Sequence, residues 1–193
     1  MQMKLFLIKC AMILSAIFPL ISAAQENSLA ESRAVATALM QQLGAALKKE
    51  MAAGGPDAAI NVCSKLAPEL ATKFSIENGW RVTRVSLKTR NPLLGTPDIW
   101  EQQALQEFDV RVAKGDAPDK LEYSETVTEP SGRYFRYVKA LPVQPLCLAC
   151  HGAAEQISAS VNATLKQHYP HDRAVGYVPG QIRGAISIKR PIP

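Results

Sequence analysis

The stretch LEYSETVTEPSGRYFRYVKAL, residues 121–141, is the part of the chain that best predicts the fold. Two runs within it, residues 121–128 and 133–141, are rich in β-branched and aromatic side chains, which favours strands. The segment EPSG between them, residues 129–132, has the proline and glycine that are typical of a tight turn. The stretch therefore predicts a β-hairpin, and a compact four-helix fold would not need so much strand-like sequence.

Helical patterns surround this hairpin, and further strands flank it. Apolar residues recur at helical spacing before and after it, and helix ends are marked by Gly54-Gly55, Gly79 and Gly115. For the third helix we expect Pro97 at the first helical position. The expected elements are helices at residues 26–52, 56–78, 97–113 and 153–168, and further strands at 80–89 and 183–189. The order predicts an α+β fold, a small antiparallel sheet packed by N-terminal and flanking helices.

Directly after the hairpin comes Cys147-Leu148-Ala149-Cys150-His151, a C-x-x-C-H motif. Two thiols at this spacing can add to the two vinyl groups of one haem, and the next residue supplies an imidazole for the iron. The motif therefore predicts one covalently bound haem c, attached through Cys147 and Cys150, with His151 as a metal ligand. The other ring nitrogen of His151 should donate to a backbone carbonyl or a carboxylate.

A C-x-x-C pair has two other interpretations. A zinc site needs about four ligands, and beyond this motif only Cys63, His168 and His171 remain as Cys or His donors after the signal segment. A redox dithiol of the thioredoxin kind usually follows a strand in a βαβ pattern, which this chain lacks. Haem attachment fits the motif better than either alternative.

The N-terminus predicts export. Lys4 and Lys9 precede an apolar run from Cys10 to Leu20, and small residues lead up to Ala24. This is the pattern of a secretory signal peptide, residues 1–24, cleaved after Ala24, although an uncleaved anchor remains an alternative. The remaining residues 25–193 fit one domain, and we expect a periplasmic or otherwise exported protein without stable membrane insertion.

The charge of the 193-residue chain is modest. The formal net charge is +5, and two of these charges are Lys4 and Lys9. No block of five or more lysines or arginines exists, which argues against nucleic acid as a partner. A mild positive charge could still attract an acidic redox partner.

The second axial ligand of the iron is less certain from the residues alone. The candidates are Cys63, His168, His171, Met40 and Met51. A methionine on a helical stripe usually serves packing, and the two histidines lie in a polar loop. Cys63 shares the apolar stripe of the second helix, and nearby ferric iron would favour its thiolate. An inert buried cysteine is an equally good interpretation at this point.

Several segments resemble one known family. They are AINVC at residues 59–63, RVSLKTRNP at 84–92, PDIWE at 97–101, CLACHG at 147–152, YP with DRAVGY at 169–177 and GQIRGA at 180–185. In this order they are similar to the PAS-like c-type haem domains, which occur as small exported proteins and as sensor regions of membrane signalling proteins. The resemblance covers about residues 58–188. The segment LLGT at residues 93–96 departs from it, where a shorter, alanine-rich link is expected.

The resemblance implies a PAS-like α+β fold with one covalent haem, and axial ligation by His151 and Cys63. We also expect at least one of Arg84 and Arg90 to bind a haem propionate, because neither has an acidic neighbour in the sequence and guanidinium groups suit carboxylates. Three aromatic residues are expected in the haem pocket or the core: Trp80, Trp100 and Tyr134.

Three classes of function follow. The first is one-electron transfer at low potential, because an anionic sulfur ligand stabilises ferric iron. The second is a haem-based redox or small-gas sensor that acts through a separate signal transducer. The third is an enzyme, but no catalytic pair is recognised. Electron transfer is preferred, because no kinase or methyl-acceptor segment is present.

Overall fold

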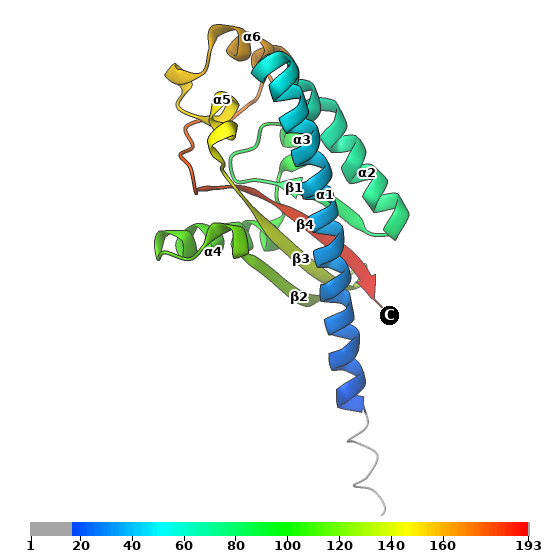
Figure 1. The fold of residues 1–193 in the computed structure, drawn as a ribbon. Coiled ribbons are helices and arrows are strands. Elements are labelled where there is room, and N and C mark those ends of the chain that lie inside the picture. Colours follow the sequence, from blue (N-terminus) through cyan, green and yellow to red (C-terminus); the bar gives the residue numbers. More distant parts are fainter. Residues whose placement is uncertain (1–16, 193) are drawn as a thin grey trace, which may run out of the picture.

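The computed structural model describes residues 17–192, with side chains from residue 25 onward (Figure 1). Residues 1–16 of the predicted signal peptide, and the side chains up to Ala24, therefore lie outside the described part. Within that part, no helix combines the length and apolar character needed to cross a membrane.

Four strands form one antiparallel sheet in the order β1-β4-β3-β2. The strands are β1 (Arg81–Val85), β2 (Glu122–Glu129), β3 (Gly132–Pro142) and β4 (Ile182–Ile192). The predicted hairpin is confirmed, since β2 pairs with β3 from Glu122 opposite Lys139 to Glu129 opposite Gly132. The expected strand at residues 80–89 is shorter, because Ser86 N–H donates to Gly95 O instead of continuing the ladder with β4.

Helices cover both faces of the sheet (Figure 1). Helix α1 (Ile17–Asn61) and α2 (Ala67–Asn78) pack on one face, and α4 (Ile99–Ala113) packs on the other. Alternate residues of β3 point to opposite sides, as strand geometry requires: Phe135 and Tyr137 contact the α1 cluster, whereas Val138 and Ala140 contact the α4 cluster. The result is the PAS-like α+β fold that the sequence predicted.

The helix ends follow local sequence rules. Gly55 interrupts α1 with φ 69° and ψ −164°, as predicted, and the chain is helical again from Pro56. Gly79 closes α2 in the left-handed conformation. The expectation for Pro97 is wrong: Asp98 is the N-cap of α4 and forms a capping box with Glu101, so Pro97 precedes the cap.

A π-helical turn, η1 (Val62–Leu66), joins α1 to α2. Ala67 N–H bonds to Val62 O, five residues back instead of four. Pro68 follows immediately and has no N–H to offer to Ser64 O, so a regular α-helical ladder cannot continue here. This turn carries Cys63.

Short helices gather at one end of the sheet. They are α3 (Pro92–Gly95), α5 (Leu148–His151) and α6 (Ala159–His168), with 3₁₀ turns η2 (Pro118–Lys120), η3 (Pro145–Cys147) and η4 (Ala154–Gln156). The helix expected from residue 153 begins only at Ala159, where Ser158 caps it. In Figure 1, α5, α6 and the C-terminal part of α1 lie together, and this end contains the predicted site.

Candidate functional site

The C-x-x-C-H motif lies just beyond the end of β3, with Cys147 at the end of η3 and the other residues on α5. Cys147 packs against one apolar cluster, formed by Val143, Ala174 and Tyr177. Cys150 packs against another, formed by Ile60, Ile157, Val161, Leu165 and Tyr169. Burial is the main cause that raises the pKa of Cys150. Both thiols are half-buried, and they lie between two apolar clusters, which suits a large apolar group.

The imidazole of His151 is held by a backbone carbonyl. Its Nδ1 lies 2.7 Å from Ala174 O, and the ring of Tyr177 meets it edge-on with centroids 6.2 Å apart. Since a carbonyl oxygen only accepts, Nδ1 carries the proton and the lone pair of Nε2 is left for another partner. This is the arrangement expected of a metal-binding histidine.

The charge state of His151 also suits a metal ligand. Burial, followed by the charges of Arg183 and Arg90, lowers the pKa of His151 well below its ordinary value. The ring therefore stays neutral at physiological pH, as coordination requires.

Residues 172–177 form a loop that is bonded to the motif. Tyr177 N–H donates to His151 O at 2.9 Å, and Gly176 N–H donates to Gly152 O at 2.8 Å. Arg173 N–H donates to Thr89 O at 2.9 Å, which connects the same loop to the segment after β1. The loop thus aligns the Ala174 carbonyl with His151 from both sides.

Arg90 lies inside this arrangement. Its Nε is 2.9 Å from Asp172 Oδ2, and its Nη2 donates to Cys150 O and, at 3.3 Å, to Ala174 O. Arg90 has no acidic neighbour in the sequence, but the fold brings Asp172 next to it. Because this buried guanidinium already contacts Asp172 and two backbone carbonyls, we expect Arg84 rather than Arg90 to bind a propionate.

Two further arginines surround His151. The Nε of Arg183 lies 3.2 Å from Nδ1 and 3.3 Å from Nε2 of His151, and its Nη1 donates to Ser86 Oγ at 2.9 Å. Burial lowers the pKa of Arg183 to about 10. The charge of Arg84 contributes to the lowered pKa of both Arg183 and His151, so Arg84 belongs to the same group of cations.

Sequence reasoning missed Arg183. A signal was present, since this arginine interrupts the otherwise apolar start of the last strand. A metal at Nε2 would have the Nε of Arg183 as a close neighbour, because this nitrogen lies 3.3 Å from Nε2.

Cys63 lies on the same side of the molecule as Cys150. After burial, the charge of Cys63 is among the causes that raise the pKa of Cys150 and of Tyr169. Cys63 is half-buried, on the π-helical turn that starts with the buried Val62. Among the described cysteines no disulfide is formed. Cys63 is thus a free thiol beside the motif.

The other ligand candidates lie differently. His168 and His171 are exposed, and Met40 packs against the cluster between α1 and the sheet. Of the three aromatic residues, Trp80 packs on that same cluster, Trp100 stacks on Tyr123, and Tyr134 lies beneath Lys189. Within residues 17–192, no three Cys, His, Asp or Glu side chains gather to hold a metal ion.

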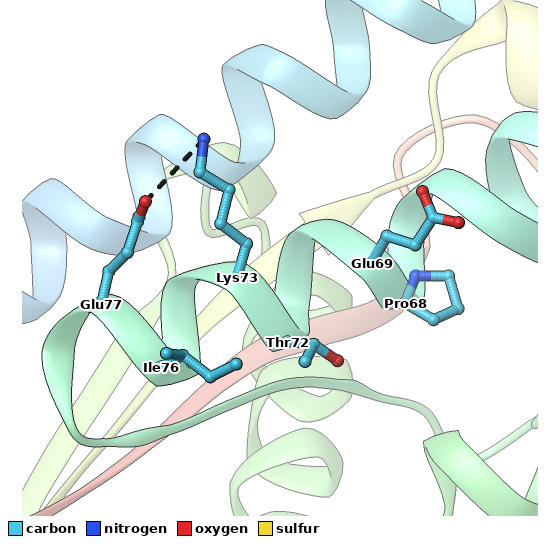
Figure 2. A pocket seen from close by; sticks show the side chains of 6 residues that line it. All are labelled: Pro68, Glu69, Thr72, Lys73, Ile76 and Glu77. Atoms are coloured by element: carbon cyan, nitrogen blue, oxygen red, sulfur yellow. Dashed lines mark ion pairs between the residues drawn. The ribbon is translucent and has the colours of Figure 1, made fainter.

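A shallow apolar depression lies elsewhere, on the outer side of α2 (Figure 2). It is lined by Pro68, Glu69, Thr72, Lys73, Ile76 and Glu77. Lys73 and Glu77 form an ion pair of 3.9 Å along the helix (Figure 2). The depression contains none of the predicted site residues.

Comparisons with known proteins place this geometry in context. Residues 22–191 of the chain match the model of the Tll0287-like family, whose description names Tll0287. It is also similar to the crystal structure of the cyanobacterial haem protein Tll0287, with 28% sequence identity and a TM-score of 0.67. That similarity covers 86% of this chain and 95% of the other. No curated protein matches the sequence.

Proposed function

Because the chain belongs to the Tll0287-like family, we propose that it is a haem protein that carries its haem at Cys147, Cys150 and His151. The observation that supports this most directly is the hydrogen bond from His151 Nδ1 to Ala174 O, which leaves Nε2 as the metal-binding atom beside two half-buried thiols. The similar cyanobacterial structure is that of a haem protein, which agrees with this proposal.

Covalent attachment uses the two thiols of the motif. Cys147 and Cys150 would hold the haem, because each thiol can add across one vinyl group, with its sulfur on one carbon and its hydrogen on the other. No oxidant is needed. The apolar clusters on which Cys147 and Cys150 pack would cover the porphyrin.

We assign Nε2 of His151 and the sulfur of Cys63 as the two axial ligands. Bound haem supplies an iron that changes oxidation state by one electron. Cys63 contributes a thiolate to it, and an anionic ligand favours the ferric form and a low potential. His151, fixed by Ala174, keeps its ring orientation in both oxidation states.

The arginines around the site suit the two haem propionates. Three positive charges lie around the site, on Arg84, Arg90 and Arg183. One negative charge, on Asp172, faces them, and it is already neutralised by Arg90. Two positive charges then remain, on Arg84 and Arg183, and two propionates carry two negative charges. We therefore propose Arg84, as the sequence suggested, and Arg183 as propionate partners.

The cellular role follows from the N-terminus and the charge. We propose that residues 1–24 direct export, that residues 25–193 form one haem domain, and that the protein exchanges single electrons with an acidic partner in the periplasm. A sensor of redox state or small gases, coupled to a separate transducer, is the alternative.

One experiment tests the proposal. The full chain is expressed with a c-type haem maturation system, washed with acidified acetone, and its ferric and dithionite-reduced spectra are recorded with pyridine haemochrome. Haem that stays attached, with a low-spin thiolate-type ferric spectrum, is the expected result. Haem that washes away or never appears would overturn the proposal. Carbon monoxide then separates the two roles, because an iron that does not bind it favours electron transfer and an iron that binds it readily favours sensing.

A further inference from the structure

Arg90 connects three parts of the chain at the back of the motif. It leaves the segment after β1, pairs with Asp172, and donates to the carbonyls of Cys150 and Ala174. Its side chain is only 8% exposed. Buried arginines are costly unless paired, so this set of contacts fixes the guanidinium in one place.

The carbonyl of Ala174 has two donors. His151 Nδ1 lies 2.7 Å from this oxygen and Arg90 Nη2 lies 3.3 Å from it. The oxygen has two lone pairs and can accept both bonds. A cationic second donor withdraws electron density from the oxygen, so it accepts less strongly from the imidazole.

The position of this carbonyl does not depend on Arg90 alone. The loop is also held by Tyr177 N–H on His151 O, by Gly176 N–H on Gly152 O, and by Ala174 N–H on Asp172 Oδ1 at 2.7 Å. Loss of the Arg90 side chain therefore leaves the acceptor in place and changes mainly its strength.

We infer that Arg90 is a positioning residue that acts on His151 through the Ala174 carbonyl, and that sharing this carbonyl limits how strongly His151 donates electrons to a metal at Nε2. The part of this inference that concerns a metal rests on the proposed haem function. A stronger Nδ1–H···O bond makes the ring more like imidazolate, which stabilises ferric iron and lowers the potential.

The test removes the cation without changing the local net charge. In the double variant R90M/D172N both members of the ion pair become neutral, and the side-chain oxygen of Asn can still accept from Ala174 N–H. Two quantities are measured in the full chain: the proton resonance of His151 Nδ1–H, and the midpoint potential. We expect a downfield shift of the resonance and a lower potential than in the wild type.

A second variant gives the opposite sign. D172N alone removes the carboxylate that pairs with Arg90, and this strengthens the hydrogen bond from Arg90 to Ala174 O. The Nδ1–H resonance should therefore move upfield, and the midpoint potential should rise. R90K keeps a cation near the carbonyl and should remain closer to the wild type than the double variant. As a matched control, Arg173→Gln removes an exposed cation from the same loop and should leave the resonance unchanged.

The outcomes separate this inference from the proposed function. The Nδ1–H resonance can be followed with or without haem, whereas covalent haem is seen in the absorption spectrum. An unshifted resonance in both R90M/D172N and D172N would overturn the role of Arg90, even in a protein with normal haem. Absence of covalent haem in the wild type would overturn the proposed function and leave the resonance as the test of Arg90.

Discussion

The hydroxyl of Ser187 donates a 2.6 Å hydrogen bond to the fully buried carboxylate of Glu101, and this bond ties α4 to β4. The same carboxylate lies 3.0 Å from Arg81 and 3.4 Å from Arg136, whose side chain is also buried. It also accepts from Asp98 N–H in the capping box. One charged side chain thus connects the face of the sheet opposite α1 to the start of a helix.

Replacing Glu101 with Gln should destabilise the protein by about 1–3 kcal/mol, because the buried cation at Arg136 loses its buried partner but keeps Asp98 at 2.7 Å. Denaturant unfolding followed by circular dichroism measures this. Asp116→Asn is the matched control, since its pair with Arg111 is exposed and should contribute less than about 1 kcal/mol. If the two substitutions lower the free energy of unfolding equally, the buried network contributes little to stability.

Replacing Cys147 or Cys150 with Ser should leave haem attached through one bond or lost altogether. Each serine lacks the nucleophilic sulfur that adds to a vinyl group. Mass spectrometry after an acidified acetone wash, together with the pyridine haemochrome spectrum, distinguishes two bonds from one. If both variants keep haem attached as in the wild type, these residues are not the attachment points.

Replacing Cys63 with Ala should produce a high-spin or water-ligated ferric spectrum and a higher potential, because the anionic sulfur is gone. Lys65→Ala, an exposed change in the same π-helical turn, serves as the control and should leave both unchanged. A spectrum that Cys63→Ala does not alter would move the ligand to His168, His171 or a methionine.

The pair between Arg33 and Glu122 predicts an acid dependence. Burial opposes ionisation of Glu122, but hydrogen bonds from Arg33 and Tyr137 outweigh it, and the pKa of Glu122 is lowered. A lowered pKa in the folded state adds stability above the unfolded value of about 4.3, and this stability is lost as the pH falls through the folded pKa.

Glu122→Gln should therefore be less stable than the wild type at neutral pH, and the difference should shrink below about pH 4. Thermal unfolding at a series of pH values measures it. Glu107→Gln, an exposed change on α4, is the control. A constant difference down to pH 2 would exclude a role of this ionisation.

Gly184→Ala should destabilise the sheet next to the site. An added Cβ would lie 2.3 Å from Val85 O, where β1 pairs with β4, and overpacking of this kind typically costs about 1–3 kcal/mol. Gly44→Ala is the contrasting control: nothing lies within 4 Å of its added Cβ, and helix propensity predicts a gain of about 1 kcal/mol. If both substitutions change the free energy of unfolding in urea in the same direction, the predicted clash at Gly184 is excluded.

Patterns of neighbouring residues predicted much of this fold. Contacts between residues that are far apart in the sequence were not predictable. The hairpin at residues 121–141 and the helix ends at Gly55 and Gly79 depend on a few neighbouring residues, so their sequence was sufficient. The pairing of Arg90 with Asp172 depends on how the end of β1 meets the loop before β4, which composition does not reveal. For the same reason Arg183 was missed, since its approach to His151 follows from the sheet order.

The π-helical turn at Val62–Leu66 has a consequence for how the ligand set can change. Such a turn holds one residue more than an α-helical turn, so deleting one of its residues would restore α-helical spacing as far as Pro68, which has no N–H to donate. Each residue of an α-helix turns by about 100°, so such a deletion rotates one side of the turn relative to the other. A deletion of three nucleotides in the gene could thus turn Cys63 away from the motif while the fold persists. If Cys63 is the iron ligand that we propose, one such deletion would convert a thiolate-ligated haem into one with an open iron position.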